Sequence, residues 1–259
     1  MKTRQPAVAG SFYPANTEKL DATITAFLAN APKRELSPKV LVVPHAGYIY
    51  SGQTAAAAYR LLQEQADTIR RSILLGPSHR VSFQGLALPD CETFTTPLGE
   101  IPLDTQAMQA LLSLGQVQVL DTAHATEHSL EVQLPFLQRC LKDFQLVPLV
   151  VGNASTMAVA EVLENVWGGD ETLIVISTDL SHYHPYDEAC ARDASTVKAI
   201  EQLTPELTGG QACGCRPLNG LLEVARQRGM QVSTLEVCNS GDTAGDKNRV
   251  VGYAAFALQ

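Results

Sequence analysis

Residues 172–182 read T-L-I-V-I-S-T-D-L-S-H, an apolar run that ends in a histidine. The same form occurs in residues 39–45, K-V-L-V-V-P-H, and in residues 72–79, S-I-L-L-G-P-S-H. Short apolar runs bounded by Pro, Gly and Ser are typical of buried strands. Buried parallel strands bring their carboxyl ends to one edge of the sheet, where ligands bind. The sequence therefore predicts that the histidines at these three ends converge in one cleft: His45, His79 and His182.

Strands and helices alternate along almost the whole chain. Apolar residues at three- and four-residue spacing predict helices over 17–30, 51–65, 104–114, 130–142, 155–167, 187–202 and 217–228. Apolar runs predict strands over 40–43, 72–75, 85–87, 118–120, 146–151, 173–177, 232–237 and 250–257. No linker, repeat or compositional break interrupts this order. The pattern predicts an α/β fold: a single domain over residues 1–259, with a central mixed, mostly parallel sheet flanked by helices.

Some local signals refine this prediction. Pro148 lies inside the run Q-L-V-P-L-V-V, which indicates an edge strand or a bulged strand. Residues 81–102, rich in Pro, Phe and Thr, are expected to form an irregular excursion or a hairpin. Four residues are suited to cap the helices that follow them: Ser51, Asp104, Ser155 and Asp187.

Composition excludes several classes of protein. The 259 residues carry a formal net charge of -8, which argues against a nucleic-acid-binding surface. The longest apolar stretches are too short to span a bilayer, and the N-terminus lacks the apolar region of a signal peptide. The six cysteines form no dense framework, so reduced thiols are expected. We expect a cytoplasmic protein that binds neither nucleic acid nor membrane.

Histidines at the ends of strands suggest metal binding or proton transfer, because imidazole is the commonest metal-binding side chain and titrates near neutral pH. Asp179 is placed to accept a hydrogen bond from an imidazole, although an aspartate here also suits a turn. Cys213 and Cys215 are separated by one glycine. No second pair of ligands accompanies them, so we expect incidental thiols near the start of a helix.

Two further segments contain side chains that could line or complete the site. Residues 124–131 read H-A-T-E-H-S-L-E, and their Thr and Ser indicate a turn that either lines the site or caps the next helix. Residues 237–246 read V-C-N-S-G-D-T-A-G-D, which predicts a polar hairpin loop. A carboxylate or thiolate from this loop would complete a site with His45 and His79. Two histidines and one carboxylate are the ligands of non-haem Fe(II) oxygenases, but zinc hydrolases use a similar set.

Six motifs in the same order resemble the Memo family over nearly the whole chain. They are V-A-G-S-F-Y-P, P-H-A-G-Y-I-Y-S-G, L-G-P-S-H, E-H-S-L-E-V-Q, S-T-D-L-S-H-Y, and S-G-D-T-A-G-D followed by V-V-G-Y-A-A. The chain is most similar to the prokaryotic branch, often called protein B of the AmmeMemoRadiSam system. The fold of this family is similar to that of class III extradiol ring-cleavage dioxygenases, which are non-haem iron enzymes.

The resemblance implies roles for individual residues. It implies metal ligands at His45 and His79, with His182, oriented by Asp179, as acid, base or additional ligand, and His128 lining the substrate pocket. In animal Memo proteins the third ligand is a cysteine of the C-terminal loop. An ungapped match places that cysteine at Thr243 here, so we predict the adjacent Asp242 as the third ligand, with Cys238 as the alternative.

The resemblance also implies a function. We expect a non-haem Fe(II) centre, with copper or zinc as alternatives, that performs redox chemistry on an unknown small molecule. Two other interpretations stay open: an adaptor that binds phosphopeptides in the same cleft, and a metal buffer. Apart from Arg80, the motifs offer no arginine for a phosphate, which favours the metal. The expected partners are an AMMECR1-type protein and a radical S-adenosylmethionine enzyme.

Overall fold

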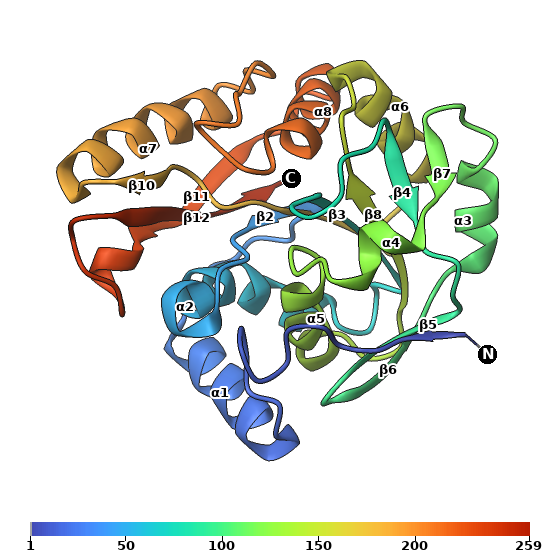
Figure 1. Cartoon of the computed structure of the whole chain (residues 1–259), viewed down its shortest axis with the longest axis horizontal. Helices are drawn as coiled ribbons and strands as arrows, with labels where there is room; N and C mark the ends of the chain where they lie inside the picture. Colours follow the sequence, from blue (N-terminus) through green and yellow to red (C-terminus); the bar gives the residue numbers. More distant parts are fainter. Residues whose placement is uncertain (1) are drawn as a thin grey trace.

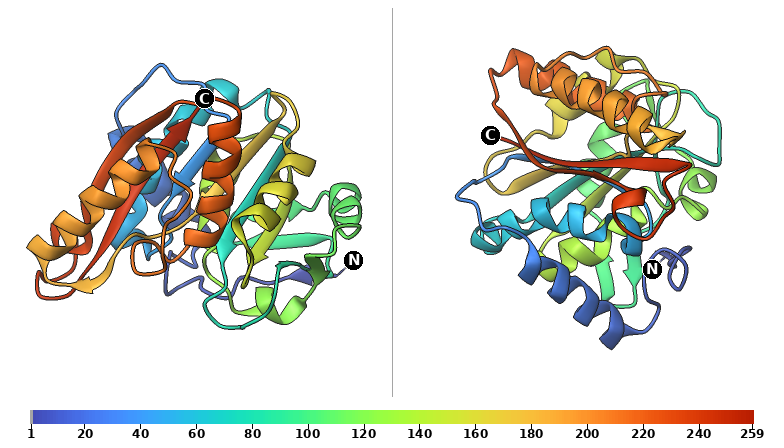
Figure 2. Two further views of the ribbon diagram at one scale, coloured as in Figure 1. Left: turned by 90° about the horizontal axis from the view of Figure 1, so that it is seen from above. Right: turned by 90° about the vertical axis from the view of Figure 1, so that its left-hand side faces the viewer.

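The computed structural model, which describes residues 2–259, places helices on both faces of one large sheet (Figure 1, Figure 2). The strands follow the order β10-β12-β2-β9-β3-β8-β4-β7, and β11 pairs with β12. Strands β2, β9, β3 and β8 are mutually parallel, whereas β12 and β4 run antiparallel to their neighbours β2 and β8. The predicted α/β fold with a mixed sheet flanked by helices is therefore confirmed; the central strands are parallel, and four of the eight strand pairings are antiparallel. The bounds are β2 (Val40–Val43), β3 (Arg71–Pro77), β4 (Leu86–Leu88), β7 (Val117–Val119), β8 (Gln145–Val151), β9 (Thr172–Ser177), β10 (His182–His184), β11 (Val232–Asn239) and β12 (Val250–Leu258).

The helices form two layers. One face of the sheet is covered by α1 (Thr17–Asn30), α2 (Tyr48–Tyr59) and α5 (Leu134–Cys140), and the other by α6 (Thr156–Val166), α7 (Tyr186–Glu201) and α8 (Cys215–Gln227). The shorter elements are α3 (Thr105–Leu111), α4 (Asp121–Ala125), η1 (Arg60–Gln65), η2 (Glu131–Gln133) and η3 (Ser240–Asp242). None of the helices in residues 2–259 has the length and apolar run that crossing a bilayer requires.

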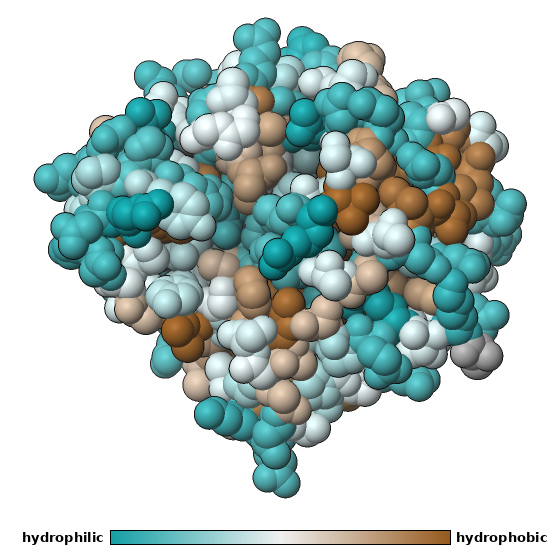
Figure 3. All heavy atoms as spheres, in the orientation of Figure 1, coloured by the Kyte–Doolittle hydropathy of each residue, from teal (hydrophilic) through white to brown (hydrophobic). Residues whose placement is uncertain are grey.

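A second, small sheet contains β1 (Thr3–Arg4), β5 (Thr93–Thr96) and β6 (Gly99–Pro102). Strands β5 and β6 are antiparallel neighbours, so the hairpin expected within residues 81–102 is present. Strand β1 adds in parallel to β5 and ties the N-terminal segment to this hairpin. On the face drawn in Figure 3 apolar side chains gather over β7, where Val119 is exposed, and smaller apolar spots lie among polar side chains elsewhere.

The prediction that Pro148 marks an edge strand or a bulge is wrong. Strand β8 lies inside the sheet, in regular parallel register with β3. Strand β4, however, pairs only with Val150 and Val151, so at Pro148 strand β8 has β3 as its sheet neighbour and none in β4. A proline lacks an amide hydrogen, and it is tolerated where one side of a strand has no ladder to complete.

Two of the four predicted helix caps are present. The side chains of Asp104 and Ser155 accept the amide hydrogens of Ala107 and Ala158 at the starts of α3 and α6. Ser51 and Asp187 are not caps, because α2 and α7 begin earlier, after the residues Gly47 and Pro185.

The parallel register fixes where the strands end. Val43 lies opposite Ser177, and Leu75 lies opposite Ile176, so β2, β9 and β3 end at the same edge of the sheet. The strands are buried along almost their whole length, as expected for a sheet covered on both faces. The segments that leave these ends carry His45, His79 and Asp179. The fold therefore delivers these three residues to one edge of the sheet.

Candidate metal centre

Three imidazoles meet at this edge: His45, His79 and His128. Each offers one ring nitrogen, and these nitrogens all lie within 4.8 Å of one another. The ring centroids are 4.6–5.3 Å apart. Among residues 2–259 this is the one group of three or more His, Cys, Asp or Glu side chains that meets this spacing. His128, predicted to line a substrate pocket, is thus the third member of the group.

Hydrogen bonds fix the ring of His45. Its Nδ1 lies 2.9 Å from the Ser177 hydroxyl, and that hydroxyl donates its own hydrogen to the carbonyl of Ser129 at 2.6 Å. Because the hydroxyl hydrogen is already used, Nδ1 must be the donor in this contact. Nε2 of the neutral ring therefore keeps its lone pair. That is the protonation state in which a histidine binds a metal.

The side chain of Glu127 fixes His79 in the same way. Its carboxylate lies 2.9 Å from Nδ1 of His79 and also accepts the amide hydrogens of His79 and Ser129. Burial alone would raise the pKa of Glu127, but the hydrogen bonds and the nearby imidazole outweigh it and lower the pKa to about 2. A carboxylate that accepts Nδ1–H of a ligating histidine orients the ring and increases its basicity.

His128 belongs to the same turn as Glu127, which we call the histidine loop (residues 124–131). Its Nδ1 lies 3.4 Å from the Glu127 carboxylate, and its ring packs on Phe12 at 4.6 Å between centroids. Burial lowers the pKa of His128 to about 4, and burial together with the neighbouring imidazoles holds the pKa of His45 well below its usual value. Both rings are therefore neutral at pH 7 and present lone pairs.

Asp179 and His182 lie beside the group, but the structure does not pair them. Asp179 accepts the amide hydrogen of His45 at 2.7 Å, and its other oxygen is 4.0 Å from Nε2 of His45. Nδ1 of His182 instead donates to the carbonyl of Leu180 at 2.8 Å. The prediction that Asp179 orients His182 is wrong, because Asp179 turns back toward β2. Burial raises the pKa of Asp179 to about 7.

The two side chains predicted as the third metal ligand are engaged elsewhere: Asp242 in the C-terminal loop (residues 239–246) and Cys238 just before it. Asp242 accepts hydrogen bonds from the Tyr186 hydroxyl at 2.6 Å and from the amide of Asn239 at 3.0 Å. The sulfur of Cys238 lies 3.0 Å from the hydroxyl of Thr54. Within residues 2–259 neither side chain joins the histidine group.

Cys213 does approach the group. Its sulfur lies 3.2 Å from Nε2 of His45, and it accepts the amide hydrogen of Asp179 at 3.3 Å. Gly214 makes this approach sterically feasible, because a Cβ there would lie 2.8 Å from the carbonyl oxygen of Ser177. The expectation that this thiol is incidental is therefore wrong in one respect, since it contacts a candidate ligand. The feature of the sequence that could have indicated this contact is Gly214, the glycine that follows Cys213.

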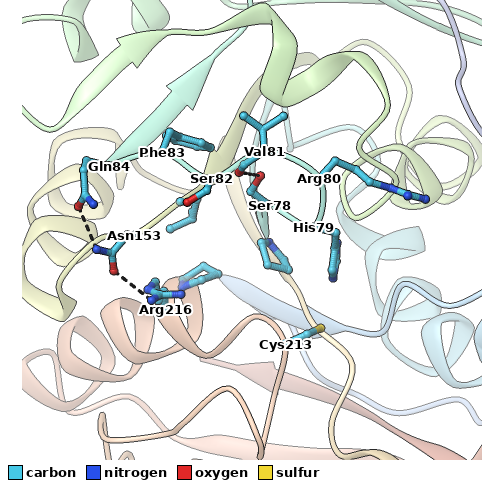
Figure 4. Close-up of a pocket in the computed structure, with 14 residues that line it drawn as sticks. Ser78, His79, Arg80, Val81, Ser82, Phe83, Gln84, Asn153, Cys213 and Arg216 are labelled. Carbon is cyan, nitrogen blue, oxygen red and sulfur yellow. Dashed lines mark hydrogen bonds between the residues drawn. The ribbon is translucent and has the colours of Figure 1, made fainter.

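Two cavities open onto the group. The first, about 570 Å³, is lined by the three rings, Asp179 and His182, with Phe12 and Arg249 at its wall. The second, about 520 Å³, is lined by His79, Cys213 and Arg216, and Figure 4 shows these residues around it. Figure 4 also shows Arg80 directed away from Arg216, and Arg80 lines the first cavity as well. His79 lines both cavities.

The chain has close relatives in sequence. It is 36% identical to a MEMO1 family protein of Aquifex aeolicus, with 98% of each chain covered. It is 37% identical to one of Methanosarcina acetivorans, with 100% of each covered, and 38% identical to one of Ignicoccus hospitalis, with 98% of each covered.

A solved structure of an uncharacterized protein from Escherichia coli K12 has a similar fold. The TM-score is 0.50 at 13% identity, over 83% of this chain and 98% of that one. The family model described as Memo-like protein matches residues 4–257. These matches span the strands, the histidine group and both loops, and the chain therefore belongs to the Memo family.

Proposed function

We propose that this protein binds a transition-metal ion through His45, His79 and His128 and acts on a small molecule in the adjoining cavity. The observation that carries the proposal is the meeting of three ring nitrogens within 4.8 Å, two of them on rings fixed through Nδ1. Nitrogens bound at about 2.1 Å to one ion in a tetrahedral arrangement lie about 3.4 Å apart. The group would therefore bind an ion after its nitrogens move together by at most about 1.4 Å.

Three imidazoles suit iron, copper or zinc. We propose Fe(II), with copper next, because the Memo fold resembles that of the ring-cleavage dioxygenases; such an ion would supply redox chemistry. The group differs from the usual two histidines and one carboxylate, since Glu127 acts on Nδ1 of His79. Three histidines also hold zinc in carbonic anhydrase, so zinc is the alternative. Analysis of the bound metal distinguishes it from iron and copper.

The remaining residues would bind the substrate and move protons. Asp179, whose pKa burial raises to about 7, exchanges a proton near neutral pH. Nδ1 of His182 is held by the Leu180 carbonyl, which leaves Nε2 for a substrate in the cavity that both residues line. A positioned acid or base of this kind contributes about 10²–10⁴ in rate. Arg80 and Arg249 line the same cavity and suit an acidic group on the substrate.

Elemental analysis tests this proposal. The protein is purified anaerobically without chelator or affinity tag, beside the double variant His45→Ala/His79→Ala. Near-stoichiometric iron or copper that disappears in the variant supports the proposal and justifies measuring O2 consumption with candidate substrates. Zinc bound in the same stoichiometry would favour hydrolysis over redox chemistry as the proposed reaction. No bound metal, even after anaerobic addition of Fe(II), contradicts the proposal and favours a cleft that only binds.

On the resemblance alone, we also propose that the protein works together with an AMMECR1-type protein and a radical S-adenosylmethionine enzyme. Co-purification of the three proteins from one cell extract tests this association. Recovery of the tagged chain without either partner under mild conditions would argue against it.

A further inference from the structure

The second cavity, about 520 Å³, differs from the first in its charge. Arg80 and Arg216 line it, and among the described residues no aspartate or glutamate belongs to its wall. The first cavity, in contrast, combines its arginines with Asp179 and Asp246. A cleft lined by one sign of charge attracts ions of the opposite sign. The second cavity is therefore a positive hollow in a chain whose formal net charge is -8.

A third cavity, beside β6 and the start of β8, provides a comparison within the same molecule. Its volume is about 530 Å³, and its wall also contains an arginine, Arg70, together with Lys142. Two carboxylates, Glu100 and Asp143, lie in the same wall. An anion there would meet like charges as well as opposite ones, and like charges placed together oppose binding. Size does not distinguish these two cavities, but charge does.

A chain of amide side chains holds Arg216 at the wall of the second cavity. Nη2 of Arg216 donates to Oδ1 of Asn153 at 3.0 Å, and Nδ2 of Asn153 donates to Oε1 of Gln84 at 3.0 Å (Figure 4). The guanidinium carries further N–H donors, which this contact leaves for a ligand or for water. Its planar fork matches two oxygens of a carboxylate or phosphate at once.

The backbone around these side chains is fixed. The amide of Asn153 donates to the carbonyl of Phe83 at 2.8 Å, and the amide of Gly152 donates to the carbonyl of Gly85 at 2.9 Å. Gly152 permits this close approach, because a Cβ there would lie 2.4 Å from the carbonyl oxygen of Phe83. Arg216 lies in the first turn of α8. The residues of the cavity are thus held by rigid elements before a ligand arrives, as a preorganised site requires.

We propose that the second cavity is a binding site for a small oxyanion, a phosphate or carboxylate group, anchored by Arg216. Figure 4 shows Arg216, Asn153 and Gln84 on one side of the cavity and His79 on the other. A ligand larger than its charged group therefore extends toward His79. The volume is in the range of small-molecule sites. The site goes beyond the function proposed above and does not need the metal, since Arg216 and Asn153 lie outside the histidine group.

Isothermal titration calorimetry with inorganic phosphate and with malonate tests the site on the full chain, as purified and after treatment with a chelator. Arg70→Gln is the matched control for Arg216→Gln, because it removes the same group from the cavity whose charges balance. Wild type and Arg70→Gln should bind at least one probe saturably, and the tighter probe identifies the charged group. Arg216→Gln should bind it about 10–100-fold more weakly, the usual effect of removing a charged hydrogen-bond partner. Chelation should leave the binding unchanged.

A measurement on the unmutated chain keeps the test independent of how the variants fold. The bound anion should slow modification of the exposed Arg216 by phenylglyoxal, followed by mass spectrometry, and leave the exposed Arg70 unaffected. No saturable binding of either probe, equal weakening in both variants, or loss of binding on chelation overturns the anion site. A chain that binds no metal but keeps binding that depends on Arg216 supports this site and contradicts only the function proposed above.

Discussion

The histidine loop and the C-terminal loop each place an acidic residue near a strand end, and they use it in opposite ways. In the histidine loop, Glu127 reaches across to a different strand end and holds both Nδ1 and the amide of His79. In the C-terminal loop, Asp242 turns back and holds the amide of Asn239 in its own loop, together with Tyr186. The first carboxylate organises the candidate metal centre, and the second organises its own turn.

The two loops also differ in how they are anchored. Glu131, at the end of the histidine loop, is completely buried and accepts hydrogen bonds from Arg4, from the hydroxyl of Tyr13 and from the amides of Ala7 and Val8. Arg4 also donates to the carbonyls of His124 and Glu127, so the N-terminal segment holds both ends of this loop. Rigid support of this kind is what a preorganised site requires.

The largest expected effect comes from breaking that anchor. In the variant Arg4→Ala, the buried carboxylate of Glu131 loses its charged partner. We expect the free energy of unfolding to fall by about 3–5 kcal/mol, the usual cost of leaving one charge of a buried pair alone. Urea unfolding measures the loss. A decrease below about 1 kcal/mol would show that the anchor does not hold the histidine loop.

The next effect concerns pH and the other histidine of this loop. His124 donates to the carbonyl of Ala87, its Nδ1 has no partner in the described structure, and burial lowers its pKa to about 4. The unfolded chain takes up this proton near pH 6.5, so stability present above that pH is lost as the pH falls toward 4. The shift corresponds to about 3 kcal/mol.

Metal-free wild type and His124→Gln should be compared by urea unfolding at several pH values between 7 and 4. The other buried imidazoles contribute a slope of the same sign in both proteins, so the difference between the two slopes isolates His124. Equal slopes would show that His124 does not carry this dependence.

A smaller effect tests the role of Glu127 directly. Glu127→Gln keeps the shape of the side chain but removes the negative charge beside Nδ1 of His79. Loss of such a partner typically lowers metal affinity by about 10–100-fold. Competition with a chromophoric chelator measures the affinity for Co(II). Asp242→Asn is the matched control and should leave it unchanged, and an equal loss in both variants would remove the distinction between the loops.

The smallest effect belongs to the C-terminal loop. Asp242→Ala removes a carboxylate that caps the turn at Asn239, and caps of this type contribute about 1 kcal/mol. We expect a loss of that size in the free energy of unfolding, measured with urea on metal-free protein. A loss comparable to that of Arg4→Ala would mean that Asp242 is as deeply integrated as Glu131.

The sequence predicts much of the fold and the place of the site because both depend on local patterns. Apolar runs identify the strands, and parallel strands must end at one edge, which places His45 and His79 together. The same reasoning brings Asp179 and His182 to that edge. Nothing local, however, specifies that Asp179 faces the amide of His45 while His182 faces the carbonyl of Leu180.

The remaining features depend on contacts between distant segments. His128 and Glu127 lie in a turn whose direction is set by Arg4 and Glu131, more than 120 residues apart. Cys213 meets His45 because the loop before α8 packs on the end of β9. The distance from the last strand predicted Asp242 as the third metal ligand. In the structure its carboxylate instead accepts the amide hydrogen of Asn239 within the same turn.

Metal content of His128→Ala and Asp242→Ala, purified side by side and reconstituted anaerobically with Fe(II), tests the central claim most directly. The claim is that His128, and not Asp242, completes the group with His45 and His79. It predicts that His128→Ala loses most of its bound metal, while Asp242→Ala stays at the wild-type level. Full occupancy in His128→Ala together with loss in Asp242→Ala would contradict the claim and return the third ligand to the C-terminal loop.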